Sequence, residues 1–152
     1  MVTRVIIFLI INFAALALGG LFTTDGVQSE WYRLLNKAPW TPPGWVFGFA
    51  WTFIMICFAF YVSYLWNHRQ QRAKLLILYT LQLVLNISWN PVFFSLHETN
   101  TALLIIVMLT ILIGYMLFAY YSKIGVRSLL VAPYFIWLII ATSLNGYICL
   151  RN

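Results

Sequence analysis

Charged residues are scarce in this sequence. Only 8% of its 152 residues are charged, and the acidic ones number three: Asp25, Glu30 and Glu98. Soluble domains carry about 25% charged residues, so this composition excludes an ordinary soluble domain. All three carboxylates lie outside the apolar segments. This argues against a proton- or ion-coupled carrier, which keeps ionisable groups inside the membrane, and no acid–base or nucleophile constellation lies within the segments either.

Cysteine and histidine are scarce as well, with two of each. Cys57 lies within one apolar segment and Cys149 at the end of another, which is typical of apolar filling rather than of a disulfide. His68 and His97 fall at segment ends, where interfacial histidines are expected. We therefore predict no metal site and no required cofactor. The net charge of +6 is better explained by cations that set membrane topology than by a nucleic-acid partner.

Hydrophobic residues, in contrast, make up 63% of the chain. They form five runs that are each long enough to cross a hydrocarbon core of about 30 Å. A cleavable signal peptide is the alternative reading of the first run, but four more runs follow it. The sequence thus predicts an all-α integral membrane protein, one domain over residues 1–152, built as a bundle of five transmembrane helices. The predicted spans are residues 4–22, 43–66, 75–96, 101–121 and 128–150, with a lid loop at 23–42.

Local signals add detail to these spans. Ala15 and Gly19 lie four residues apart, a spacing that lets helices pack closely, and Leu16 and Gly20 repeat it. Asn12 is the only polar side chain deep in the first span, so we expect it to bond another helix. Thr41 is a plausible N-cap for the second span, with Pro42 and Pro43 in its first turn.

Five spans place the two termini on opposite sides of the membrane. Six cations fall on the N-terminal side and three on the other, so the positive-inside rule predicts a cytoplasmic N-terminus, with the C-terminus and the lid loop on the outer side. The six are Arg4, Arg69, Arg72, Lys74, Lys123 and Arg127, and the three are Arg33, Lys37 and Arg151.

Unusual aromatic and amide residues gather at one depth beneath the lid loop. The stretch 31–51 holds four of the seven tryptophans. In the third span, the residues that share one helix face are Gln82, Asn86, Trp89 and Phe93. In the fifth span, the residues that recur every four positions are Pro133, Trp137, Ala141 and Asn145. With a rise of about 1.5 Å per residue, they and Trp51 lie at similar depth. This predicts a ligand pocket under the lid. The alternatives are interhelical hydrogen bonds for the amides and an interfacial belt for the loop aromatics.

These residues resemble the TspO/MBR family, which comprises the tryptophan-rich sensory proteins of bacteria and the mitochondrial translocator protein, or peripheral-type benzodiazepine receptor. The matching motifs are Trp31-Tyr32 with Lys37, Trp40-Thr41-Pro42-Pro43, Phe47, Trp51, Gln82, Asn86, Trp89, Phe93-Phe94, Pro133-Tyr134, Trp137, Ala141, Leu144-Asn145 and Arg151-Asn152. There are two departures from the family pattern. Ala38 separates Lys37 from Pro39, and Ile54-Met55 replaces a Leu-Tyr pair.

The resemblance implies a membrane receptor or sensor, commonly a homodimer. It would bind porphyrins, haem-type molecules, benzodiazepine-type drugs or sterols beneath the first loop. The implied ligand-binding residues are Trp31, Tyr32, Lys37, Trp40, Pro42, Pro43, Phe47, Trp51, Asn86, Trp89, Phe93, Trp137, Ala141 and Asn145. A sterol motif matches Leu144, Tyr147 and Arg151, but the pattern is loose enough to match three other places in the chain, and an interfacial anchor is the alternative.

Two other functions stay open at this point. The family resemblance also implies light- or oxygen-dependent porphyrin breakdown, with Trp51 and Trp137 as redox candidates. Facilitated movement of tetrapyrroles across the membrane is the other. The absence of an acid–base site within the spans favours a receptor over an enzyme.

Overall fold

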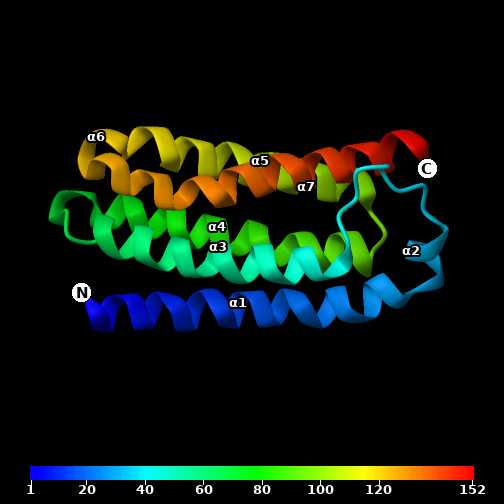
Figure 1. Ribbon diagram of the computed structural model, residues 1–152, viewed down its shortest axis with the longest axis horizontal. Coiled ribbons are helices and arrows are strands. Elements are labelled where there is room, and N and C mark those ends of the chain that lie inside the picture. Colours follow the sequence, from blue (N-terminus) through cyan, green and yellow to red (C-terminus); the bar gives the residue numbers. More distant parts are fainter.

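The computed structural model describes all 152 residues as a helical bundle without strands. Figure 1 shows the long helices side by side, with the N-terminus at one end of the bundle and the C-terminus at the other. The elements are α1 (Val2–Gln28), α2 (Glu30–Leu34), α3 (Gly44–Leu65), η1 (Arg69–Gln71), α4 (Arg72–Phe94), α5 (Thr99–Ala119), α6 (Tyr121–Ile124), η2 (Gly125–Val131) and α7 (Ala132–Arg151).

Four helical stretches are long and apolar enough to cross a membrane, and the last of them, Thr99–Arg151, has 53 residues. That stretch folds back on itself, so it supplies two antiparallel helices, α5 and α7 (Figure 1). The reversal falls at Gly125, whose φ of +57° is a conformation that glycine adopts without the steric penalty of a Cβ atom. The predicted architecture of five long helices is therefore confirmed.

The bundle has two distinct ends. We call the end that holds residues 29–43, the α4–α5 turn and Asn152 the loop end, and the end that holds Met1, η1 and α6 the turn end (Figure 1). Helix α1 packs on α3 and α4, while α5 packs on α4 and α7. The fully buried aromatic residues, including Phe58, Tyr61 and Tyr134, belong to one continuous core between these helices.

Asn12 forms the interhelical bond that its position predicted. Its Nδ2 donates to the carbonyl of Met55 at 3.0 Å, and its Oδ1 accepts from the Tyr79 hydroxyl at 2.7 Å. One buried amide therefore links α1, α3 and α4 near the middle of the bundle. Side-chain hydrogen bonds are favoured there because an apolar surrounding offers no competing water.

The predicted boundary of the first span was wrong, because α1 continues from residue 22 to Gln28. The hydroxyls of Thr23 and Thr24 donate to the carbonyls of Gly19 and Gly20, at 3.2 and 2.9 Å. Both side chains are thus satisfied within the helix, and the polar sequence does not end it. Ser29 ends α1 and starts α2, since its Oγ accepts from the Tyr32 amide at 3.2 Å. The lid, which we define from here on as residues 29–43, is shorter than predicted.

The predicted N-cap was also wrong. Helix α3 begins at Gly44, and Pro43 occupies the capping position in an extended conformation, with φ −57° and ψ 148°. A residue before proline is disfavoured in the helical region, which keeps both Thr41 and Pro42 out of the helix. The Thr41 hydroxyl instead donates to the carbonyl of Ala38 at 2.7 Å.

Candidate functional site

A cavity of about 680 Å³ lies at the loop end, between α1, α3, α4 and α7 and beneath the lid. Its lining combines aromatic, small and amide side chains. The residues are Ala15, Leu16, Gly19, Gly20, Thr23, Thr24, Val27 and Gln28 from α1; Tyr32, Lys37, Thr41 and Pro42 from the lid; Gly44, Phe47, Gly48, Trp51 and Thr52 from α3; Asn86, Trp89, Asn90, Phe93 and Phe94 from α4; and Ala141, Leu144, Asn145 and Ile148 from α7.

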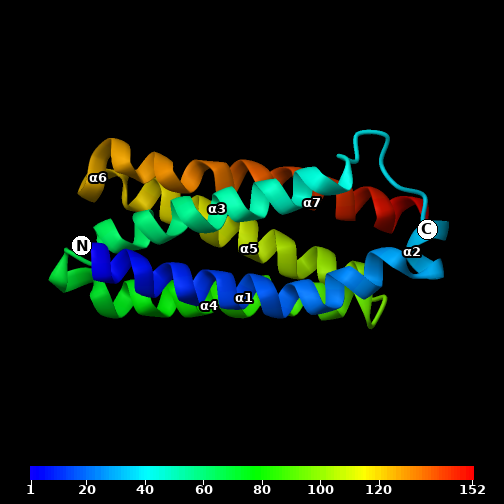
Figure 2. The same cartoon turned by 60° about the horizontal axis from the view of Figure 1, so that its bottom comes forward.

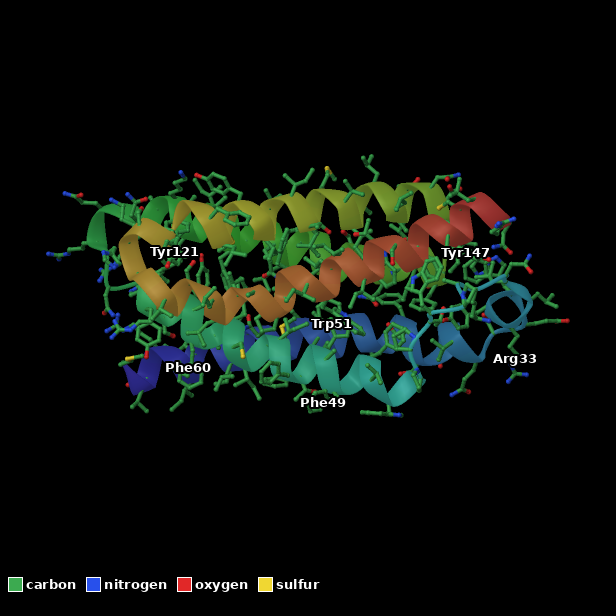
Figure 3. The ribbon with its side chains drawn as sticks, turned by 45° about the horizontal axis from the view of Figure 1, so that its top comes forward. Arg33, Phe49, Trp51, Phe60, Tyr121 and Tyr147 are labelled. Carbon is green, nitrogen blue, oxygen red and sulfur yellow. The ribbon has the colours of Figure 1, made fainter.

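Aromatic rings form two walls of this cavity. On α4, Trp89 and Phe93 stack with ring centroids 5.0 Å apart and planes inclined by 16°. They lie one helical turn apart, so their faces form one surface. On α3, Trp51 points toward α7, whereas Phe49 on the same helix points away from the bundle (Figure 3). The Trp51 ring meets the edge of Tyr134 at 5.8 Å, which fixes its orientation at the bottom of the cavity.

The amides of the cavity hold helices together. Asn86 donates from Nδ2 to the hydroxyl of Tyr134 at 2.8 Å, and Gln82 donates to the same hydroxyl at 2.8 Å. Asn145 uses both ends of its amide, accepting from the Trp89 indole at 3.1 Å and donating to the Thr99 carbonyl at 3.0 Å. Interhelical bonding is thus part of their role. The Oδ1 of Asn86 has no such partner and remains an available acceptor at the cavity wall.

The lid is held in place by three of its aromatic residues. Trp31 stacks on His97 at 4.0 Å and meets Phe93 at 5.6 Å, so α2 lies against the α4–α5 turn. Tyr32 packs against Phe94 at 5.7 Å, and burial raises the pKa of its hydroxyl. Trp40 donates from its indole to Ser143 at 3.2 Å. These contacts join the lid to the end of α4, to the α4–α5 turn and to α7.

Polar contacts fasten the same segment to the C-terminus. The amide of Asn36 donates to Oδ1 of Asn152 at 2.9 Å, and Asn152 donates from Nδ2 back to the Asn36 carbonyl at 3.4 Å. Lys37 lies with its Nζ 4.5 Å from the centre of the Tyr32 ring. Lys37 is the one charged residue among those that line the cavity.

Ten of the fourteen predicted ligand-binding residues line this cavity. The four that do not are Trp31, Trp40, Pro43 and Trp137. Trp31 and Trp40 secure the lid through the contacts above, and Pro43 caps α3. Trp137 is buried behind the lining, where its ring meets Phe47 edge-on at 5.3 Å and its indole nitrogen has no hydrogen-bond partner. Of the two redox candidates, only Trp51 borders the cavity.

The three residues of the predicted sterol motif divide between two environments. Leu144 lines the cavity. Tyr147 meets the Trp40 ring at 5.4 Å, and the Arg151 guanidinium lies 5.7 Å from the Tyr147 ring centre. Tyr147 and Arg151 thus support the lid at the loop end and do not join Leu144 in one pocket.

Helix α1 is the part of the site that sequence reasoning missed. Its glycines were predicted to pack, and Gly19 does so, since an added Cβ would meet the Asn90 side chain at 2.6 Å. At Gly20, Gly44 and Gly48 an added Cβ would meet nothing within 4 Å. These three glycines face the hollow instead. Gly44 and Gly48 lie four residues apart at the start of α3. This spacing was the sequence signal that could have predicted the hollow between α1 and α3.

Helices α1 and α3 together form one side of the cavity. Helices α1 and α3 lie close near the turn end and diverge toward the lid (Figure 2). Lining residues from both helices, Thr24 on α1 and Gly48 and Thr52 on α3, are exposed.

Long apolar helices, a hollow lined by aromatic rings and a fastened lid define a small α-helical integral membrane protein with an internal pocket. The sequence pattern of the TspO/MBR family matches residues 7–151. The chain is 36% identical over 119 residues to the tryptophan-rich sensory protein of Cereibacter sphaeroides, covering 76% of this chain and 73% of that relative.

Two other relatives widen the range of organisms. The tryptophan-rich protein TspO of Archaeoglobus fulgidus is 33% identical over 159 residues, covering 100% of this chain and 96% of its own. The human translocator protein is 33% identical over 125 residues, covering 79% of this chain and 73% of its own. This chain belongs to the TspO/MBR family of membrane proteins.

Proposed function

We propose that this protein is a membrane receptor that binds porphyrins and related flat, hydrophobic molecules in the cavity beneath the lid. The observation that carries the proposal is the aromatic lining of that cavity. Its volume of about 680 Å³ falls within the range of about 300–1,000 Å³ usual for ligand pockets. The faces of Trp89 and Phe93 on one side and Trp51 on another offer stacking surfaces to a planar ring system.

Polar groups support the same ligand class. The free Oδ1 of Asn86 is an acceptor for a pyrrole N–H, and the Lys37 ammonium at the cavity lining would attract a propionate carboxylate. No Asp or Glu lines the cavity, so nothing there repels that carboxylate. An apolar body with an acidic edge is the ligand chemistry that this arrangement favours.

A titration of the purified protein with protoporphyrin IX in the dark, followed by tryptophan fluorescence, tests the proposal. We expect saturable quenching in the parent protein. Ala141→Leu should raise the Kd about tenfold, which corresponds to about 1.4 kcal/mol, because Ala141 lines the cavity and the added atoms occupy it. Ala17→Leu adds the same atoms to an exposed position of α1 and should leave the Kd unchanged.

A second pair of variants locates the ligand. Trp51 borders the cavity, whereas Trp45 on the same helix is 73% exposed and does not line it. Trp51→Phe should remove more of the saturable quenching than Trp45→Phe does. Absence of saturable binding, or equal effects of the two replacements, would contradict a ligand in this cavity.

The same protein samples distinguish the two alternative functions, porphyrin breakdown and facilitated transport. If porphyrin breakdown is the function, light should generate new absorbing products in the parent protein and none in Trp51→Phe, because Trp51 is the one of the two redox candidates that borders the cavity. If facilitated transport is the function, protein in vesicles should accelerate the loss of porphyrin from the lumen, and Ala141→Leu should slow it.

We also propose that the N-terminus is cytoplasmic and that the lid lies on the outer side. The support is that all six cations of the N-terminal side gather at the turn end of the bundle, as the positive-inside rule favours. Fusions of a phosphatase that folds only outside the cytoplasm check this orientation. A fusion after Asn152 should be active and one after Ser122 inactive, and the reverse pattern would overturn it.

A further inference from the structure

The net charge of the protein is concentrated at the turn end. Its six cations there face no Asp or Glu, whereas the three carboxylates, Asp25, Glu30 and Glu98, all lie at the loop end together with the three remaining cations. The loop end is therefore neutral in sum, and the whole +6 belongs to the turn end. Such a surface attracts anions, and the attraction decreases with distance over about one Debye length.

Most of these cations already have partners within the chain. Arg4 donates to Oδ1 of Asn67 at 2.6 Å, and Arg72 donates to the carbonyl of Trp66 at 2.9 Å. Lys74 donates to the hydroxyl of Tyr115, and the Arg127 guanidinium lies 4.8 Å from the centre of a tyrosine ring. Neither Arg69 nor Lys123 makes a side-chain hydrogen bond, an ion pair or a contact with an aromatic face.

Those two cations without partners meet at one place. A second cavity, of about 220 Å³, is lined only by His68, Arg69, Gln70, Gln71 and Lys123, with no hydrophobic residue among them. The connection between α3 and α4 supplies four of these residues, and α6 supplies Lys123. The lining offers hydrogen-bond donors from every residue and positive charge from at least two, which is the chemistry that recognises an anion.

The position of this cavity identifies the source of the anion. It lies where helix α3 ends and helix α4 begins. The aromatic residues near that level are Tyr64, Trp66, Tyr115 and Tyr121. Tryptophan and tyrosine mark the level of lipid headgroups in membrane proteins. Beside Lys123, the side chains of Tyr121 and Val126 are 55% and 71% exposed and offer apolar surface for an acyl chain. Figure 3 shows Tyr121 at this end of the bundle, away from the Trp51 cavity.

We propose that the cavity formed by His68, Arg69, Gln70, Gln71 and Lys123 binds the headgroup phosphate of an anionic phospholipid. The bound lipid joins the α3–α4 connection to α6, two segments that are far apart in the sequence. The site is separate from the cavity beneath the lid and does not depend on the ligand proposed for it.

Lipid retention by the purified full-length protein tests this proposal. The protein in neutral detergent is titrated with phosphatidylglycerol or with phosphatidylcholine, and bound lipid is counted by native mass spectrometry. We expect phosphatidylglycerol to be retained in preference. The double variant Arg69→Gln, Lys123→Gln should weaken its binding about 30-fold, as expected for the removal of two cations near an anionic headgroup.

The control is a second double variant, Arg4→Gln, Arg127→Gln, which removes the same charge from the same end. If the cavity is the site, this control retains phosphatidylglycerol nearly as well as the parent protein. Equal weakening by both variants would mean general attraction to the basic end and would overturn the proposal. No preference over phosphatidylcholine would do the same.

Two further measurements keep the result unambiguous. Thermal unfolding without added lipid should give the Tm of the parent protein for Arg69→Gln, Lys123→Gln, since neither Arg69 nor Lys123 has a side-chain partner to lose. Inorganic phosphate is titrated as a separate probe with the same readout. If inorganic phosphate displaces phosphatidylglycerol at equal concentration, the lipid gains nothing from its acyl chains, and a free anion replaces the phospholipid as the proposed occupant.

Discussion

The two halves of helix α3 differ sharply in burial. All eight buried residues of α3 lie between Ile54 and Leu65, and Gly44–Phe53 contains none. The second half is packed into the core of the turn end, whereas the first half borders the cavity at the loop end. One continuous helix thus serves as structural support along one half and as a pocket wall along the other.

This difference arises from side-chain size and from one hydrogen-bonded junction. In the packed half, Phe58 and Tyr61 fill the space between helices. In the hollow half, Gly44 and Gly48 leave it open. The bonds of Asn12 to Met55 and Tyr79 lie at the transition between the two halves, beyond which α1 and α3 diverge (Figure 2).

The largest effect should come from removing a ring in the packed half. Phe58 is fully buried, and Phe58→Ala should lower the free energy of unfolding by about 3–5 kcal/mol, because the neighbouring helices cannot close the space. Phe49→Ala makes the same change on the same helix, at a side chain that is 66% exposed, and should lower it far less. Unfolding in mixed micelles with increasing SDS measures both. Similar losses would contradict the division of α3 into two halves.

The next largest effect on stability compares two glycines of α1, one packed closely against another helix and one beside open space. A Cβ added at Gly26 would lie 2.5 Å from the Cβ of Phe94, whereas one added at Gly20 would meet nothing within 4 Å. Gly26→Ala should therefore destabilise the protein by about 1–3 kcal/mol, and Gly20→Ala should leave the Tm nearly unchanged. Thermal unfolding of both variants checks the pair. A loss of stability in Gly20→Ala would mean that this face of α1 is packed.

A smaller effect separates ligand binding from helix bonding in the hollow half. Asn86 and Gln82 donate to the same Tyr134 hydroxyl, but only Asn86 borders the cavity. Asn86→Leu should weaken porphyrin binding by about 1 kcal/mol, the usual contribution of one hydrogen bond. Gln82→Leu removes the equivalent interhelical bond and should leave binding intact. Titrations and thermal unfolding of both variants measure the two effects, and equal losses of affinity would assign Asn86 a purely structural role.

The smallest effect concerns the junction itself. Asn12 and Tyr79 share one hydrogen bond of 2.7 Å between α1 and α4. A double-mutant cycle of Asn12→Leu and Tyr79→Phe should give a coupling energy of about 0.6 kcal/mol, typical of such bonds in membranes. The cycle uses the free energy of unfolding in SDS. A coupling near zero would show that the contact between α1 and α4 at this junction depends on packing alone.

The sequence by itself determined that the chain crosses a membrane as a bundle of five helices with its termini at opposite ends. It also indicated that Trp51, Asn86 and Asn145 lie at one depth beneath the first connection. These properties are local, because apolar length, turn signals and rise per residue belong to each helix alone.

Only the tertiary structure decided which face of each helix meets a hollow. In the structure Trp137 lies behind the cavity lining, whereas Gly20 is part of that lining. Trp31 and Trp40 hold the lid in place. The tertiary structure likewise brought Arg69 and Lys123 together from separate connections. Such outcomes depend on the angles at which neighbouring helices cross, and those angles result from the packing of all the helices at once.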